Sequence, residues 1–238
     1  MEKGMRTPSP PKKTLNYDAG APLGIVESLR KNKNQVERIE FRDLKVTGHV
    51  GNKVAFVLDN VLSKEECELI ITKTEERGYE QALVNVGAGR QRYIPEVRNN
   101  YRVMSDDPMF GQLLLDRVAA YVPKEIDGKP LEGLNERMRF LRYHKGEYFA
   151  PHFDGTFTRP DRSAKSILTF QLYLNEEMEG GETTFFDILV DGKRESRLPI
   201  TPKPGRVLIF QHAIYHEGTE LRDGVKYAMR TDIMYKLK

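Results

Sequence analysis

The 238-residue sequence contains one cysteine, Cys67. A single cysteine excludes an internal disulfide and a zinc site built from several thiolates, and it favours a reducing compartment. No apolar run approaches the ~18–20 residues that cross a bilayer, and the opening MEKGMRTPSPPKK lacks the apolar stretch of a secretory signal. We therefore expect a cytoplasmic protein, with the nucleus as the alternative, that has no membrane partner.

The chain also has little excess charge, with 38 basic and 35 acidic residues and a net charge of +3. Four basic residues and Glu2 lie within the first 13 residues and account for this whole excess. The remaining chain is neutral and offers little attraction for phosphates, so nucleic acid is not an expected partner.

Three regions follow along the chain. Residues 1–22 carry four prolines and no apolar periodicity, which predicts a disordered, basic, Pro-rich tail. Residues 23–136 form a support region of strands and helices, and residues 137–238 form a β core. No internal repeat is present.

Two helices in the support region have clear start signals. Ser63 and Glu66 form a capping box, and Gly78 marks the end of that helix. Asp107 and Pro108 mark the start of the second helix.

The C-terminal region reads as short strands separated by Gly, Pro and Asp, a pattern typical of a sandwich or barrel. The expected strands are Arg137–Tyr143, Tyr148–Asp154, Ser166–Asn175, Glu182–Phe186, Arg206–Gln211 and Tyr227–Tyr235. In the third strand Thr169, Gln171 and Tyr173 share one face, opposite an apolar face. Polar groups on an internal face are costly unless they have a partner, which indicates a ligand pocket there.

The pair His152 and Asp154 suggests a metal site. Residues i and i+2 of a strand point to the same face, so this imidazole and carboxylate converge. Nitrogen and hard oxygen ligands suit a divalent ion such as Fe(II), and one more distant histidine would complete a two-histidine, one-carboxylate triad. His216 and His212 are the candidates for this third ligand, while His49 and His144 are assigned no role.

Together with a set of ordered motifs, these residues make the chain resemble the Fe(II)/2-oxoglutarate-dependent dioxygenases, and within them the prolyl 4-hydroxylase-like group. The resemblance covers roughly residues 54–238. The matching motifs are Tyr143-x-x-Gly146, Pro151-His152-Phe153-Asp154, Tyr173-Leu174-Asn175, Gly180-Gly181-Glu182-Thr183-x-Phe185, Pro204-Gly205-Arg206, and His216 with Lys226 ten residues later.

The resemblance implies a mainly β protein with supporting helices, whose core is a double-stranded β-helix (jelly-roll, cupin-like). It implies that His152, Asp154 and His216 bind Fe(II) as the catalytic and metal residues. It also implies 2-oxoglutarate and O2 as cosubstrates, ascorbate as the reductant, and succinate and CO2 as products. The expected 2-oxoglutarate-binding residues are Lys226, Tyr143, Tyr173, Thr183 and Arg230.

Some roles stay open at this point. Arg230 shares a strand face with Lys226, so it is either a cofactor-site residue or a member of an ion pair at the rim. The polar run Val86–Arg102 lies between helical segments, and in the resembled family this region closes over a peptide. The expected substrate-binding residues are Arg90, Arg92, Arg98 and Arg139, with a solvated surface loop as the alternative for the first three.

The expected function is hydroxylation of a peptide or protein residue, proline first. The alternative is a free amino acid or other small metabolite, because no separate peptide-binding domain is evident. A non-catalytic jelly-roll binding module and a nucleic-acid demethylase are more remote alternatives. The sequence does not indicate the oligomeric state.

Overall fold

The computed structural model describes residues 20–30, 34–39, 53–87, 90–186 and 197–237. Nearly all of the expected tail, residues 1–22, lies outside this part of the chain, as does His49.

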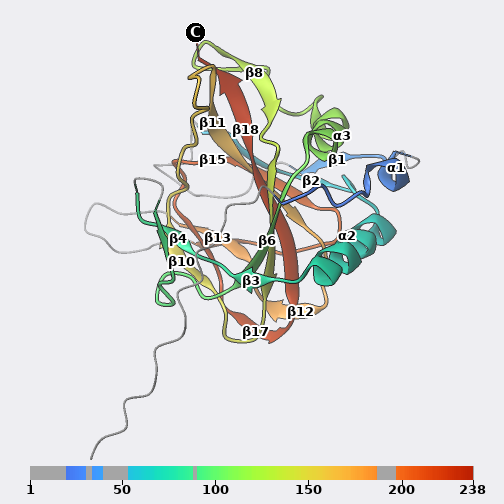
Figure 1. The fold of residues 1–238 in the computed structure, drawn as a ribbon, viewed down its shortest axis with the longest axis vertical. Helices are drawn as coiled ribbons and strands as arrows, with labels where there is room; N and C mark the ends of the chain where they lie inside the picture. The colour runs from blue at the N-terminus through green and yellow to red at the C-terminus, as the bar shows by residue number, and fades with distance from the viewer. Residues whose placement is uncertain (1–19, 31–33, 40–52, 88–89, 187–196, 238) are drawn as a thin grey trace, which may run out of the picture.

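Two antiparallel sheets face each other (Figure 1). The larger sheet has the order β1 (Glu37–Ile39), β2 (Ala55–Asp59), β15 (Val207–Gln211), β11 (Ala164–Tyr173), β18 (Lys226–Lys236), β9 (Arg137–Tyr143), β6 (Tyr101–Asp106) and β3 (Glu80–Gln81). At one end, β8 (Lys129–Leu134) pairs with β18, and β7 (Glu125–Ile126) pairs with β8. The smaller sheet has the order β10 (Phe149–His152), β16 (His216–Gly218), β13 (Thr183–Phe186) and β14 (Arg197–Ile200).

Two further ribbons of two strands each lie outside these sheets. They are β12 (Met178–Gly180) with β17 (Leu221–Gly224), and β4 (Val84–Asn85) with β5 (Gln91–Arg92). Strand β5 lies within the polar run Val86–Arg102, and β4 directly precedes that run.

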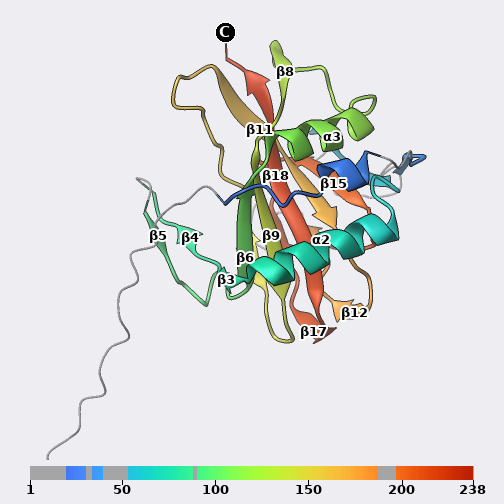
Figure 2. The ribbon, with the colours of Figure 1, turned by 45° about the vertical axis from the view of Figure 1, so that its right-hand side comes forward.

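Three helices are present in the described residues: α1 (Val26–Leu29), α2 (Lys64–Arg77) and α3 (Pro108–Val118). Figure 2 shows α2 and α3 lying across the outer face of the larger sheet. The capping box is confirmed, since Ser63 Oγ accepts from the Glu66 amide and the Glu66 carboxylate accepts from the Ser63 amide. Asp107 caps α3 by accepting from the Phe110 amide.

The alternation in β11 divides the apolar interior into two cores. Leu168, Phe170 and Leu172 face α2 and α3 within one large cluster. On the other face, Tyr173 packs with Phe185 of the smaller sheet in a second cluster. The larger sheet is therefore buried on both faces, and the space between the two sheets can hold a pocket.

These observations confirm a mainly β protein whose helices support one face of a two-sheet core. Strand β9 has the predicted bounds, and the bounds of the other five predicted strands agree to within two residues. Strand β6 is not predictable from its own sequence, because Arg102, Ser105 and Asp106 make it too polar to read as a strand. Pairing with β9 along its full length supplies the partners that the sequence does not reveal.

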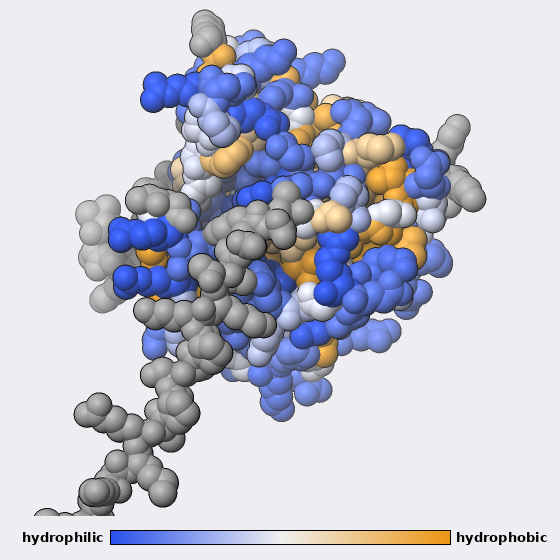
Figure 3. All heavy atoms as spheres, in the orientation of Figure 1, coloured by the Kyte–Doolittle hydropathy of each residue, from blue (hydrophilic) through white to orange (hydrophobic). Residues whose placement is uncertain are grey.

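Among the described residues, no helix is long and apolar enough to cross a membrane. On the face shown in Figure 3, hydrophilic residues predominate, and hydrophobic surface gathers on the right-hand side where Figure 1 places α1 and α2.

Candidate active site

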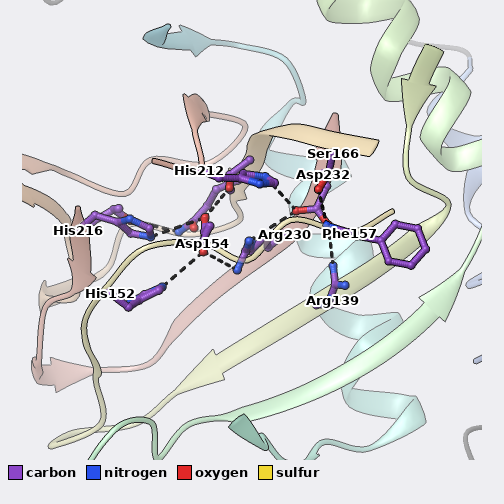
Figure 4. Close-up of polar contacts among 12 residues, drawn as sticks. Arg139, His152, Asp154, Phe157, Ser166, His212, His216, Arg230 and Asp232 are labelled. Atoms are coloured by element: carbon purple, nitrogen blue, oxygen red, sulfur yellow. Dashed lines mark hydrogen bonds and ion pairs between the residues drawn. The ribbon is translucent and has the colours of Figure 1, made fainter. Parts of the chain in front are cut away.

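Two histidines and one aspartate converge between the sheets (Figure 4). His152 ends β10 and His216 begins β16, and the antiparallel pairing of these strands sets the two histidines opposite each other. Asp154 follows two residues after His152. His152 Nε2 lies 3.4 Å from Asp154 Oδ1, and His216 Nε2 lies 3.8 Å from Asp154 Oδ2. One ligand atom from each residue lies within 4.8 Å of the others.

A hydrogen bond from Nδ1 to a backbone carbonyl orients each of the two imidazoles. His152 Nδ1 is 2.8 Å from the Ala150 carbonyl oxygen, and His216 Nδ1 is 2.9 Å from the Ile214 carbonyl oxygen. A carbonyl can only accept, so each Nδ1 donates to it, and each Nε2 is directed toward Asp154. Burial lowers the pKa of His216 to about 4, which keeps this imidazole neutral at ordinary pH. Neutral imidazole is the form that binds metals.

Asp154 is ionised in this setting. Burial alone would raise the pKa of its carboxyl, but the adjacent Arg230 guanidinium favours the charged form, and the pKa lies well below its usual range. Arg230 Nη1 lies 2.8 Å from Asp154 Oδ1, and Thr169 donates a hydrogen bond to Oδ2. Although buried, Oδ1 accepts no hydrogen bond from the described residues.

This donor set fits a divalent metal ion. Two imidazole nitrogens and one buried, ionised carboxylate converge with one ligand atom each within 4.8 Å of the others, so a single ion could be bound by all three. Two imidazoles and one carboxylate are the ligands of the facial triad of non-haem Fe(II) enzymes.

Lys226 lies in the same pocket as His152 and His216. Its side chain is 2% exposed, and the described residues give it no ion-pair partner. The ammonium lies 5.0 Å from the ring centroid of Tyr143 and 5.7 Å from that of Tyr173. Burial lowers the pKa of Lys226 to about 8, with only Glu182 opposing the shift. A buried ammonium held by two aromatic rings is suited to binding a carboxylate.

Thr183 and Gln171 line the same pocket as Lys226. Tyr173 donates to Thr183 Oγ1 at 2.7 Å, and Gln171 Nε2 donates to the same oxygen at 3.1 Å. Tyr143 lines the pocket with Lys226, and its pKa is raised by burial. The structure thus places the expected group Lys226, Tyr143, Tyr173 and Thr183 together, and all four are buried.

The four arginines expected to contact substrate divide into two pairs. Arg98 and Arg139 line the pocket, while Arg90 and Arg92 are exposed in and beside the β4–β5 hairpin. Arg98 stacks 4.8 Å over the Phe149 ring, and its Nε donates to Asn100 Oδ1 at 2.6 Å. Arg230, which was expected either at the cofactor site or in an ion pair, lines the pocket and pairs with Asp154.

His212 does not belong to the cluster of possible metal ligands. It is buried, and its Nε2 lies 3.6 Å from Asp232 Oδ1 (Figure 4). The sequence analysis missed Asp232, although a signal existed: it has the same strand parity as Lys226 and Arg230. Asp232 also lies 3.5 Å from both Arg139 and Arg230.

Comparisons with known proteins give one family and a set of related enzymes. Residues 138–231 match the model of the 2OG-Fe(II) oxygenase superfamily. Two similar curated proteins come from Arabidopsis thaliana. Probable prolyl 4-hydroxylase 3 is 27% identical over 135 residues, covering 55% of this chain and 45% of that protein. Prolyl 4-hydroxylase 1 is 25% identical over 201 residues, covering 72% and 65%. The chain thus spans less than two thirds of the length of both relatives.

Solved structures support the fold. A prolyl hydroxylase from Trichoplax adhaerens, in complex with a peptide fragment of the hypoxia-inducible factor oxygen degradation domain, matches with a TM-score of 0.55. It is 14% identical, and the match covers 79% of this chain and 86% of that one. A viral collagen prolyl hydroxylase from Paramecium Bursaria Chlorella virus-1, in its 2-oxoglutarate complex, has a TM-score of 0.52 and 20% identity, covering 79% and 99%.

Proposed function

We propose that the chain is an Fe(II)- and 2-oxoglutarate-dependent hydroxylase acting on a peptidyl residue, proline first, since residues 138–231 match the 2OG-Fe(II) oxygenase superfamily. One observation carries the proposal. A single pocket holds two members of a metal-binding triad from the smaller sheet and, from the larger sheet, the buried ammonium of Lys226, to which the described residues give no ion-pair partner.

The residues divide the work of binding. His152, Asp154 and His216 would hold Fe(II), and Lys226 would bind the far carboxylate of 2-oxoglutarate with help from Tyr143 and Thr183. Bound Fe(II) and 2-oxoglutarate supply the oxidation chemistry, in which O2 yields succinate, CO2 and a hydroxylated product. Thr169 and Arg230 fix the carboxylate of Asp154, so its orientation is set before the metal binds.

Two observations favour a peptide as substrate. The related proteins are prolyl hydroxylases, and one solved relative was captured with a peptide. Phe153, which separates the two metal ligands His152 and Asp154, is 51% exposed and packs 4.9 Å from the Tyr215 ring. The exposed Phe153 ring, supported by the half-buried Tyr215, offers apolar surface to an extended chain beside the proposed metal ligands.

The test is oxygen incorporation into proline-containing peptides. With Fe(II), 2-oxoglutarate, ascorbate and O2, we expect a peptide to gain the mass of one oxygen atom. His152→Ala should lose this product, and His144→Ala, a change at an exposed histidine, should retain it. Oxygen gain by free amino acids but by no peptide would contradict a peptidyl substrate.

A further inference from the structure

Two arginines face each other across neighbouring strands beside the metal triad. Arg230 of β18 and Arg139 of β9 are register partners, and both side chains line the pocket. Like charges placed directly opposite in a sheet are destabilising. A folded protein that contains such a pair gives up some stability at this position. Locally unfavourable features of this kind occur mainly at functional sites.

The neighbouring carboxylate offsets this repulsion only in part. Asp232 lies 3.5 Å from Arg139 and 3.5 Å from Arg230, whereas a strong charge-assisted hydrogen bond is ~2.7–2.9 Å long. Arg230 has its close contact elsewhere, at 2.8 Å from Asp154. For Arg139, Asp232 is the only ion-pair partner among the described residues.

The pocket also contains more positive than negative side chains. Its wall carries the cations Arg98, Arg139, Arg230 and Lys226, and the carboxylates of Asp154 and Asp232 adjoin them. Glu217 also lines the pocket, but it pairs with Arg197 at 3.1 Å. Fe(II) and the dianion 2-oxoglutarate cancel each other's charge, so the loaded pocket keeps its positive excess.

Burial makes that excess costly. It lowers the pKa of Arg98 to about 10 and also lowers the pKa of Arg139. A desolvated guanidinium without a close anion costs stability, and a bound anion recovers that cost.

We propose that Arg139, with Arg98 beside it, binds a carboxylate of the substrate, so the enzyme hydroxylates a group that carries a carboxylate nearby. This inference rests on the proposed function and names its substrate class. Lys226 and Arg230 lie four residues apart on β18, roughly 13 Å along the strand, and Arg139 pairs with Arg230. A short diacid bound at Lys226 therefore leaves Arg139 available to a second carboxylate.

Calorimetry on the loaded protein tests this without turnover. The full chain is first loaded with Mn(II) and 2-oxoglutarate in the absence of O2. This step tests the proposed function separately, because failure of 2-oxoglutarate to bind would overturn that function whatever the substrate class. Acid and amide probes are then titrated in matched pairs. The free pair is L-proline with L-prolinamide, and the peptide pair is a blocked Pro-Glu peptide with its Pro-Gln counterpart.

We expect at least one acid to bind about tenfold or more tightly than its amide. Preference within the free pair alone identifies a small amino acid as substrate, and preference within the peptide pair identifies an acidic peptide. Arg139→Gln should abolish the preference while 2-oxoglutarate still binds, and Arg139→Lys should keep part of it. Arg142→Gln is the matched control, because Arg142 lies on the opposite face of β9 and pairs with Glu75 of α2.

The proposal is overturned if no acid binds, if acids and amides bind equally, or if Arg139→Gln keeps the preference. If Arg139→Gln fails to fold, the acid and amide titrations of the unaltered protein decide the matter alone.

Discussion

At the scale of one residue, Lys226 lowers the stability of the ligand-free fold and provides a charge that can bind a carboxylate. Its ammonium is buried, the described residues give it no ion-pair partner, and burial lowers its pKa from 10.5 to about 8. A lysine with a lowered folded-state pKa destabilises the fold below that pKa, and the penalty fades as pH rises from 8 toward 10.5. A bound carboxylate removes the penalty.

Replacing this charge should therefore stabilise the ligand-free protein. We expect Lys226→Met to raise the free energy of unfolding at pH 7 by about 1–3 kcal/mol. The same change should weaken 2-oxoglutarate binding by about 10- to 100-fold. Urea denaturation and calorimetry with Mn(II) measure the two effects, and Lys145→Met, at an exposed lysine, is the control. A destabilised variant with unchanged 2-oxoglutarate affinity would contradict this role.

The same lysine predicts a pH dependence for cosubstrate binding. Below pH 8 Lys226 is already charged, so 2-oxoglutarate affinity should be constant there. Above pH 8 binding must take up a proton, and affinity should fall by up to about tenfold per pH unit. In Lys226→Arg the cation stays charged, so this slope should vanish in any variant that still binds. An equal slope in both proteins, measured by calorimetry, would assign the titration to another group.

At the scale of elements, the turn that precedes β15 packs against the backbone just before the start of α2. Gly205 lies just before β15 with φ of +73°, a conformation that L side chains rarely adopt. A Cβ there would overlap the Leu62 carbonyl oxygen, directly before the helix cap Ser63. The Pro204-Gly205-Arg206 motif therefore has a structural role, and Arg206 adds a close ion pair with Asp59 of β2.

Gly205→Ala should consequently destabilise the fold by about 3 kcal/mol through the unfavourable backbone angle and the steric overlap. The matched change Gly133→Ala meets only one side chain at ordinary contact distance and should be nearly neutral. Thermal and urea unfolding compare the two variants. Equal stabilities would mean that the turn relaxes without cost.

The sequence predicts where helices and strands lie better than it predicts which strands pair with each other. The capping box of α2 and the alternation of β11 are local patterns, so the helix start and the polar face of the strand could be predicted. Both depend on residues only a few positions apart.

Register across strands is not local, which limits what could be predicted of the site. That Arg139 lies opposite Arg230, or that Asp232 lies near both, depends on how β9 pairs with β18. Nothing within either strand encodes that pairing, so the ionic cluster emerged only from the structure. The convergence of His152 with His216 depends likewise on the pairing of β10 with β16, and the resemblance to known enzymes supplied it before the structure did.

At the scale of the whole molecule, the two sheets perform different tasks. The larger sheet is braced by helices on its outer face and presents Lys226, Arg230 and Arg139 inward. The smaller sheet supplies both histidines of the triad. Neither sheet alone holds a complete site, so the proposed chemistry requires that they stay packed through the Tyr173 and Phe185 core.

The proposed function requires that this pocket oxidise 2-oxoglutarate with Fe(II) and O2. The most direct measurement is succinate formed from 2-oxoglutarate by the purified full chain, with and without Fe(II). We predict Fe(II)- and O2-dependent succinate that falls at least about 100-fold in His216→Ala and is unchanged in His144→Ala. Absence of succinate from a protein that binds Fe(II), or full activity in His216→Ala, would contradict the account.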